Sequence, residues 1–241
     1  MPSIKAVLFD LDDTLWPIVP VIKRAEDVLY DWLSIHVPEV ARIVSIESMR
    51  ERRQVLMATD PLYQIDLQAL RHAVLSEAFV QTGQDLAMVD KAMEVFSRAR
   101  NAVTPFSDVL PTLKALQPRV ALGTISNGMA DLETIGIAHF FQTSIAAHHF
   151  GSAKPDASIF LAACESLAVE PHETVYIGDD PLLDVEGAQN AGLNTIWMNR
   201  LDLEPARLLP EHVRPDAICA TLHEVSNWLD GRIAKPGNGQ I

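Results

Sequence analysis

Four short polar motifs in this chain combine residue types that could bind and transfer an anionic group. Each one follows a stretch with strand character or opens a stretch with helix character. Taken singly, each is also explained by an ordinary turn or helix cap. The motifs are Asp10-Leu11-Asp12-Asp13-Thr14, Ser126-Asn127-Gly128, Lys154-Pro155-Asp156 and Gly178-Asp179-Asp180-Pro181-Leu182-Leu183-Asp184.

The first motif places two carboxylates on one side of the chain. Residues two apart in an extended backbone share a face, so Asp10 and Asp12 point the same way and Leu11 points back. Two carboxylates at that spacing can share a divalent cation, or one can act as a nucleophile and the other as a proton donor. A solvated acidic turn before a helix is the structural alternative.

The second and third motifs offer groups that attract anions. The hydroxyl of Ser126, the amide of Asn127 and free backbone N–H groups at a helix start form an anion site. Lys154 precedes another predicted helix and could direct its ammonium group at the same anion. An ordinary N-cap and a surface lysine are the alternatives.

The fourth motif supplies oxygen ligands of the kind that Mg²⁺ prefers. Gly178 would let the backbone approach a ligand closely, and three aspartates follow it. Asp180 is predicted to be the N-cap of a helix from Pro181 to Ala191 that ends before Gly192. That role leaves Asp179 and Asp184 without a structural explanation.

The elements that must position these motifs are six short apolar runs, which we predict to be buried parallel strands. Helical patterns, such as the one from Asp156 to Leu167, lie between them and predict an α/β fold with helices on both faces of the sheet. Ligands of such sheets bind outside the carboxyl ends of the strands, where the motifs fall. The runs are Ile4–Phe9, Val120–Ile125, Thr143–Ala147, Thr174–Gly178, Leu193–Met198 and Ala217–Cys219.

Residues 17–105 have a different pattern. Apolar residues recur there at helical spacing without a convincing strand, which predicts an all-helical module of about four helices inserted after the first strand. The predicted organisation is a core of residues 1–16 plus 106–233, the helical insert 17–105, and a loose tail, 234–241. The repeats are Val28, Leu29, Trp32 and Leu33; Leu67, Leu70, Val74 and Ala78; and Leu86, Val89, Met93 and Phe96.

The amino-acid composition limits the kinds of binding partner and the cellular compartment that we expect. The 241 residues carry 19 basic against 32 acidic side chains, a net charge of −13, which disfavours nucleic acid and anionic membranes as partners. Apolar stretches are too short for a membrane span, and no signal peptide is apparent. Cys164 and Cys219 lie in apolar runs and predict buried thiols, with one long-range disulfide as the alternative. We therefore expect a cytoplasmic protein.

The four motifs, in this order, resemble those of the haloacid-dehalogenase-like hydrolase superfamily. The match covers Ile4–Leu15 and about Phe106–Leu229, and the helical insert occupies the place of the family's helical cap. The resemblance implies a Rossmann-like parallel sheet core with an all-helical cap. It also implies a magnesium-dependent phosphomonoester hydrolase that acts on a small phosphorylated metabolite.

Residue by residue, the resemblance implies a two-step reaction. Asp10 would attack phosphorus and form an aspartyl-phosphate, and Asp12 would protonate the leaving oxygen and then activate water. Magnesium would lie among the Asp10 side chain, the Asp12 backbone carbonyl and Asp179, with Asp184 ordering a metal-bound water or Lys154. The dehalogenase branch of the family lacks the second aspartate of the first motif, so Asp12 disfavours cleavage of a carbon–halogen bond.

The remaining motif residues would bind the phosphoryl group. Ser126 and Lys154, with help from the Asn127 region, would hold its oxygens and balance their charge. His148 and His149, ahead of Lys154, stand where relatives often carry acids, and they are either substrate contacts or plain loop residues.

One branch of the family resembles the chain more closely. The segment FDLDDTLWPIVPVIKRAE is similar to the start of bacterial phosphatases of flavin mononucleotide and of a phosphorylated pyrimidine in riboflavin synthesis. Trp16, Tyr63 and the pair Arg52-Arg53 are candidate cap contacts, but core packing and a solvated helix face explain them as well.

Three other functions were weighed. A phosphorylation-switched receiver domain has its acidic pair before the phosphoacceptor and a much shorter fold, so we exclude it. A sugar-phosphate mutase of the same superfamily and a catalytically silent binder of phosphate ligands stay as alternatives. The sequence leaves the physiological substrate and the oligomeric state open.

Overall fold

The computed structural model describes residues 3–201, 203 and 207–233. Within them the chain divides into two compact units. The sheet unit comprises the residues up to Pro17, Thr104–Gly128 and the residues from Gly136 on; the helical unit comprises Ile18–Val103 and Met129–Ile135. The predicted loose tail, 234–241, lies outside the described residues.

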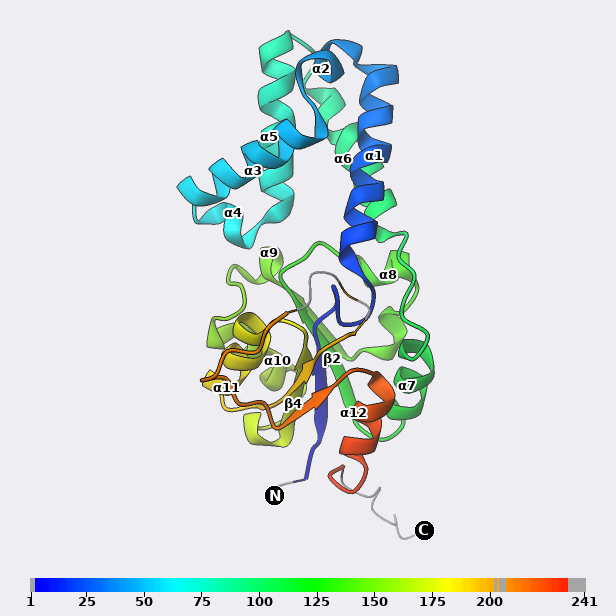
Figure 1. Cartoon of the computed structure of the whole chain (residues 1–241), viewed down its shortest axis with the longest axis vertical. Coiled ribbons are helices and arrows are strands. Elements are labelled where there is room, and N and C mark those ends of the chain that lie inside the picture. Colours follow the sequence, from blue (N-terminus) through cyan, green and yellow to red (C-terminus); the bar gives the residue numbers. More distant parts are fainter. Residues whose placement is uncertain (1–2, 202, 204–206, 234–241) are drawn as a thin grey trace. The chain divides into compact units, whose positions relative to one another are not determined.

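The sheet unit contains six parallel strands in the order β3-β2-β1-β4-β5-β6 (Figure 1). This arrangement confirms the predicted α/β fold with a Rossmann-like sheet, and every predicted strand is present with its ends within two residues of the prediction. The strands are β1 (Ala6–Phe9), β2 (Ala121–Ser126), β3 (Thr143–Ala146), β4 (Thr174–Gly178), β5 (Asn194–Met198) and β6 (Ala217–Cys219).

The strand order reverses direction at β1, which pairs with β2 on one side and with β4 on the other. Crossovers from such a reversal run to opposite faces of the sheet and leave a crevice at the carboxyl ends of the strands. The backbone N–H of Asp10 donates to the carbonyl of Ile177 at 2.9 Å, so β1 and β4 end at the same edge of the sheet. The first and fourth motifs therefore emerge side by side.

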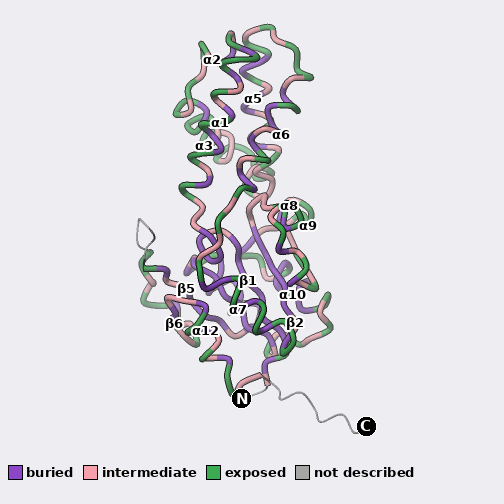
Figure 2. Tube along the Cα trace, turned by 90° about the vertical axis from the view of Figure 1, so that its right-hand side faces the viewer, coloured by how far each residue is buried: buried purple, intermediate pink, exposed green. Residues whose placement is uncertain are grey.

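Helices cover both faces of this sheet (Figure 1). The helices α10 and α11 contact each other on one face, and α7 and α12 contact each other on the other. The central strands are consequently buried along their length, as the purple segments of Figure 2 show. The bounds are α7 (Val109–Leu116), α9 (Ala147–Phe150), α10 (Ala157–Ser166), α11 (Gly187–Asn190) and α12 (Leu222–Leu229), with 3₁₀ turns at Ala138–Phe140 and Pro171–Glu173.

The predicted helix from Pro181 to Ala191 differs from a regular α-helix. Its first six residues, Pro181–Glu186, form a π-helical turn (η3), and α11 follows directly. Asp180 caps it as predicted, because its side chain accepts from two backbone N–H groups, those of Leu182 and Leu183. Gly192 follows the end with a φ of +86°. Hydropathy patterns cannot distinguish a π turn from an α turn over so few residues.

The helical unit contains six helices before Val103 and the short α8 (Leu132–Ile135) after β2, all of them described. The sequence predicts about four helices; four of the six are long, and a shared core includes Leu33, Val74 and Phe96. Leu86 departs from its predicted place in the stripe, because it precedes its helix and is 51% exposed. The six are α1 (Ile18–His36), α2 (Pro38–Ile43), α3 (Ile46–Thr59), α4 (Leu62–Ile65), α5 (Leu67–Thr82) and α6 (Ala87–Asn101).

Two further sequence features have simple outcomes. Cys164 and Cys219 are buried free thiols, so the alternative of a disulfide between them does not hold. A search of the described helices finds none that combines the length and the apolar character that a membrane crossing requires.

A buried arginine ties the start of the chain to its last strands. Arg200 donates from Nη1 to Oδ2 of Asp108 at 2.7 Å, and from Nε and Nη2 to the carbonyl of Thr14 at 3.2 and 3.0 Å. Its guanidinium lies 4.3 Å from the ring centroid of Phe106. The Asp108 carboxylate also accepts from the backbone of Leu222 at 2.7 Å. The buried Arg200 side chain therefore holds the loop that carries the first motif, through the carbonyl of Thr14.

We expect Arg200→Met to lower the free energy of unfolding by about 3–5 kcal/mol, because it leaves the Asp108 carboxylate buried without its cation. The matched control is Arg119→Met, which breaks a pair with Asp230 whose side chains are 36% and 60% exposed. That loss should stay below about 1 kcal/mol. Urea unfolding of both variants measures the difference, and equal losses would contradict a structural role for the buried pair.

Candidate active site

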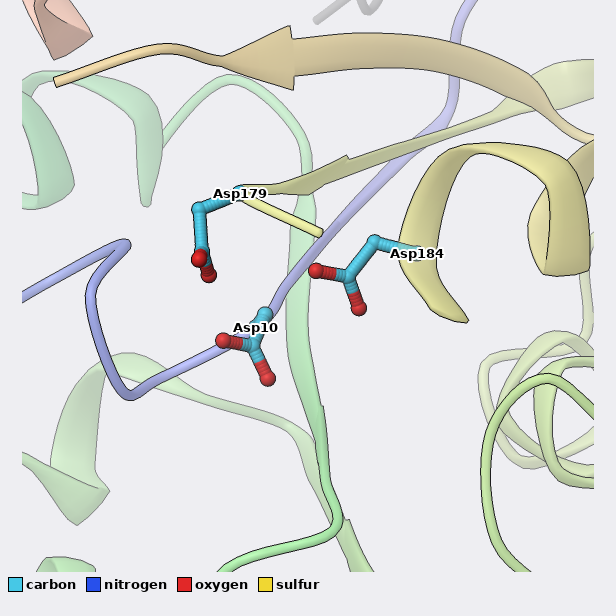
Figure 3. Close-up of side chains that lie close together, drawn as sticks. All are labelled: Asp10, Asp179 and Asp184. Carbon is cyan, nitrogen blue, oxygen red and sulfur yellow. The ribbon is translucent and has the colours of Figure 1, made fainter. Parts of the chain in front are cut away.

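Three aspartates from separate parts of the chain converge at the carboxyl ends of β1 and β4. Asp10 follows β1, Asp179 follows β4, and Asp184 lies in the π turn η3. All three are buried, and one carboxylate oxygen of each lies within 4.8 Å of the others (Figure 3). Such a set of oxygens is what a small divalent cation requires.

Lys154 lies among these carboxylates. Its ammonium group donates to Oδ1 of Asp10 at 2.5 Å, to Oδ1 of Asp184 at 2.6 Å and to the hydroxyl of Tyr176 at 3.0 Å. All three donors of the ammonium are thus used. The lysine side chain is 3% exposed, so this is a buried ion network and not the surface lysine of the structural alternative.

The backbone of Lys154 is held by Asn127. The Asn127 amide donates to the Lys154 carbonyl at 3.0 Å and accepts from the Lys154 N–H at 2.9 Å. The third motif is thereby fixed to the second, across the ends of different strands. In this arrangement the Asn127 side chain positions the lysine, while its predicted part in anion binding stays a prediction.

Ser126 and Asp12 complete the set of predicted residues. Ser126 ends β2, is 4% exposed, and its Oγ accepts from the Gly128 N–H at 2.9 Å, which leaves the hydroxyl proton for another partner. Asp12 is half-buried, and its Oδ1 accepts from the indole N–H of Trp16 at 2.8 Å. The indole fixes the orientation of that carboxylate.

Comparison with known proteins identifies the family. A family model of haloacid dehalogenase-like hydrolases matches residues 4–192. The chain belongs to this family. The match spans all four motifs and confirms the resemblance drawn from the sequence.

Named relatives of this hydrolase include phosphatases. The chain is 29% identical over 216 residues to the 5-amino-6-(5-phospho-D-ribitylamino)uracil phosphatase YigB of Escherichia coli, covering 86% of this chain and 90% of the relative. It is 32% identical to a glyceraldehyde 3-phosphate phosphatase of Methanopyrus kandleri, over 84% of this chain and 88% of the relative.

A solved structure of a protein named for a different reaction is also similar. The crystal structure of a 2-haloacid dehalogenase from Pseudomonas syringae shares 36% identity with the hydrolase at a TM-score of 0.84. The superposition covers 95% of this chain and 99% of that one. The relatives therefore span two reactions, which the residues of the site must distinguish.

Four contacts of the site were not predicted from the sequence. Tyr176 lies two residues before Gly178 on β4 and shares its face of the sheet, so strand alternation could have indicated it. Thr14 donates from Oγ1 to Oδ1 of Asp179 at 3.2 Å, and its place in the first motif was the available signal. The sequence indicated Trp16 only as a candidate cap contact and not as a partner of Asp12, and Arg207 carried no comparable signal.

Arg207 lies near three acidic residues of the first and fourth motifs. Its Nε lies 2.8 Å from Oδ2 of Asp179, it pairs with Asp180, and its Nη2 is 3.8 Å from Oδ2 of Asp13. The Asp179 Oδ2 atom is buried and accepts no hydrogen bond of good geometry among the described residues. That oxygen is therefore a suitable ligand atom for a cation.

Burial, together with the charges of neighbouring acids, raises the pKa values of Asp10 and Asp179. Burial raises the pKa of Asp10 to about 7, against the opposing effect of Lys154, and Asp184 adds to the rise. Burial raises the pKa of Asp179 to about 9, and the charges of Asp10 and Asp184 contribute. Burial alone would lower the pKa of Lys154, but Asp10 and Asp184 together hold it well above its ordinary value. The residues present therefore fit a divalent cation, which would replace protons as the counter-charge.

We expect the metal-free hydrolase to lose stability as the pH rises from about 6 to about 9. The folded protein retains a proton on Asp179 up to a pKa of about 9, whereas the unfolded chain releases it near 3.8, so the stabilisation is complete at low pH and disappears through the folded pKa. Melting temperatures in EDTA measure this, and Asp179→Asn should flatten the dependence.

Magnesium should raise the melting temperature more at the upper end of that pH range than at the lower end, since it competes with protons there. The exposed Asp156 offers a control, Asp156→Asn, which should behave like the wild type because asparagine also caps a helix. A magnesium effect independent of pH would contradict the proposed competition.

Proposed function

We propose that this hydrolase is a magnesium-dependent phosphatase of a small phosphorylated metabolite and works through an aspartyl-phosphate. The observation that supports this best is the Lys154 ammonium bound between Asp10 and Asp184, with Asp179 beside them and Asp12 two residues after Asp10. Transfer of a phosphoryl group depends mainly on position and on balancing of charge, and this set offers both.

In the first step an oxygen of Asp10 attacks phosphorus. The bond from Asp10 to phosphorus forms as the bond to the leaving oxygen breaks, and Asp12 gives that oxygen its proton. In the second step Asp12 takes a proton from water, whose oxygen attacks phosphorus, so that inorganic phosphate leaves and the Asp10 carboxylate returns. The indole of Trp16 holds one oxygen of Asp12 through both steps.

Lys154 has two tasks in this reaction. It holds Oδ1 of Asp10 at 2.5 Å, which leaves the other carboxylate oxygen to attack, and its charge offsets that of the phosphoryl group. Ser126 would donate its hydroxyl proton to a phosphoryl oxygen. Asn127 fixes the backbone of Lys154 through two hydrogen bonds, and Asp184 orients its ammonium group.

Magnesium would be held by the side chains of Asp10 and Asp179 and the backbone carbonyl of Asp12. When bound it neutralises the phosphoryl oxygens. Without it, three carboxylates would face a phosphate dianion, and their charges repel one another. We assign the helical unit, residues 17–105 in the sequence-based division, the part of a cap that excludes water and recognises the leaving group.

Flavin mononucleotide and the related riboflavin-pathway phosphate are the proposed substrates. The similarity of the N-terminal segment and the YigB relative both support this branch. Its setting would be the cytoplasm, in keeping with the two free thiols. A mutase that returns the phosphoryl group to a sugar phosphate, or a silent binder of a phosphate ligand, is the alternative that product analysis decides.

A second candidate activity, removal of halide from a 2-haloacid, is favoured by the likeness to the Pseudomonas syringae structure. The same Asp10 would then attack carbon. Asp12 argues against it, because a halide leaves without a proton and the dehalogenase branch lacks this aspartate. Inorganic phosphate release from a panel of phosphomonoesters, with magnesium and with EDTA, should exceed chloride release from 2-chloropropionate. Halide release alone would overturn the phosphatase proposal.

We expect Asp10→Asn to lower kcat by roughly 10³-fold or more, since the amide cannot act as the nucleophile. Steady-state phosphate release measures this, with Asp156→Asn as the control that keeps full activity. Circular dichroism and thermal unfolding establish that the variant is folded. Substantial activity in folded Asp10→Asn would exclude the aspartyl-phosphate route.

A further inference from the structure

The helical unit contains a charge cluster at the meeting point of its long helices. Glu26 of α1 is 2% exposed, and three arginines approach it from two other helices. Arg50 and Arg53 come from α3 and Arg71 comes from α5. The cluster lies wholly within one unit and is built from residues outside all four motifs.

Two of the arginines make all the hydrogen bonds of good geometry that the Glu26 carboxylate accepts among the described residues. Arg50 donates from Nε and Nη2 to Oε2 of Glu26 at 2.8 and 2.5 Å, and Arg53 donates from Nη2 to Oε1 at 2.5 Å. The nearest Arg71 nitrogen, Nη1, is 3.9 Å from Oε1, which is too far for a hydrogen bond. Arg71 therefore interacts with Glu26 by charge but makes no hydrogen bond to it.

Arg71 is consequently buried with unmet hydrogen bonds. It is 8% exposed, and its Nε and Nη1 have no hydrogen-bond partner among the described residues. The ring of Phe96, whose centroid is 3.5 Å from the guanidinium carbon, covers one face of the group but cannot satisfy the N–H groups at its edge. A charged donor left unpaired in the interior is costly, so such groups are normally found with a partner.

The cluster also carries excess positive charge. Three guanidinium groups share one buried carboxylate, and two further acids that act on Arg50, Glu47 and Asp27, are exposed. Burial lowers the pKa of Arg71 to about 9, and the charge of Arg53 adds to that effect against the attraction of Glu26. In a chain with a net charge of −13 such a buried excess requires an explanation.

We propose that Arg71 and Arg53 form a binding site for an oxyanion, the carboxylate or phosphate group of a small molecule. The planar fork of a guanidinium matches both groups, and the edge N–H groups of Arg71 would supply the hydrogen bonds. Side-chain exposures of 15% for Arg53 and 43% for Arg50 leave one side of the cluster accessible. The oxyanion belongs either to the substrate or to a separate ligand.

Sulfate is the probe for the site itself. Thermal unfolding in EDTA, with sodium sulfate against sodium chloride at equal ionic strength, should show a sulfate-specific rise of about 2–4 °C. The rise should disappear in Arg71→Met and persist in Arg98→Met, which changes an exposed arginine of α6. Without sulfate, Arg71→Met should melt no lower than the wild type, because the substitution removes a buried charge whose Nε and Nη1 lack hydrogen-bond partners among the described residues.

The arginine Nε–Hε signals of the wild-type protein give a second readout that does not depend on a variant that folds. The Arg71 signal, assigned with Arg71→Lys, should shift on addition of sulfate, while the Arg98 signal should stay in place. An unmoved Arg71 signal, or a full sulfate effect in folded Arg71→Met, would overturn the proposal. These measurements need no turnover, so they stand apart from the proposed phosphatase activity.

The source of the oxyanion is decided with two substrates that differ by one carboxylate, O-phosphoserine and O-phosphoethanolamine. If the substrate supplies the group, Arg71→Met should raise KM for O-phosphoserine about tenfold or more and leave that for O-phosphoethanolamine unchanged. Equal KM values, with the sulfate effect intact in the wild type, would assign the site to a separate ligand. This arm alone rests on the proposed phosphatase chemistry, and a KM effect confined to O-phosphoserine would replace the flavin-branch substrates, which carry no second oxyanion, by a phosphomonoester with a carboxylate.

Discussion

The ion network around Lys154 is the interaction on which the site depends. Asp10 and Asp184 are almost without contact with water, and the ammonium group between them makes their burial tolerable. Asn127 fixes the backbone of Lys154 through two hydrogen bonds. The hydroxyl of Tyr176 accepts the third hydrogen bond of the ammonium group and donates one to the Ile125 carbonyl at 3.1 Å. Removal of the lysine would leave several acids facing one another in a medium of low polarity.

The geometry of that network leaves little freedom to its neighbours. A Cβ atom on Gly178 would lie 2.4 Å from the carboxyl carbon of Asp184, so only glycine permits the aspartate to reach Lys154. The second oxygen of Asp184 accepts from the backbone of Asp180 at 2.8 Å, which secures the π turn that presents it. From the opposite side Arg200 holds the carbonyl of Thr14, whose hydroxyl bonds Asp179. Each aspartate is thus positioned by groups that have no chemistry of their own.

The two units present opposite electrostatic problems. In the sheet unit acids crowd around one lysine, and burial raises the pKa values of Asp10 and Asp179. When no cation is bound, protons on these acids therefore neutralise part of the negative charge. In the helical unit three guanidinium groups crowd around one carboxylate, and the pKa of Arg71 falls. A cation fits the first imbalance and an anion fits the second. The family match itself, to haloacid dehalogenase-like hydrolases, is compatible with either named reaction of the relatives, and Asp12 is the residue that favours the phosphatase.

The sequence by itself determined the strands, the helix caps and the acids of the motifs. Runs such as Thr174–Gly178 are apolar and of strand length, and a cap such as Asp180 acts on backbone N–H groups two and three residues away, so both are set by local chemistry. The order of the motifs sufficed to indicate the family. What depends on neighbours close in the chain could be predicted.

The tertiary structure decided every contact between distant parts of the chain. Thr14 meets Asp179 across 165 positions, and Lys154 meets Asp10 across 144, so no pattern in either segment encodes the pairing. For the same reason the sequence could not predict the partners of Arg207. It also could not predict that Arg53 pairs with the buried Glu26, while its neighbour Arg52 pairs with Glu77 at the surface. Local sequence sets which groups are available, whereas burial and charge balance, which exist only once the chain is folded, decide which of them meet.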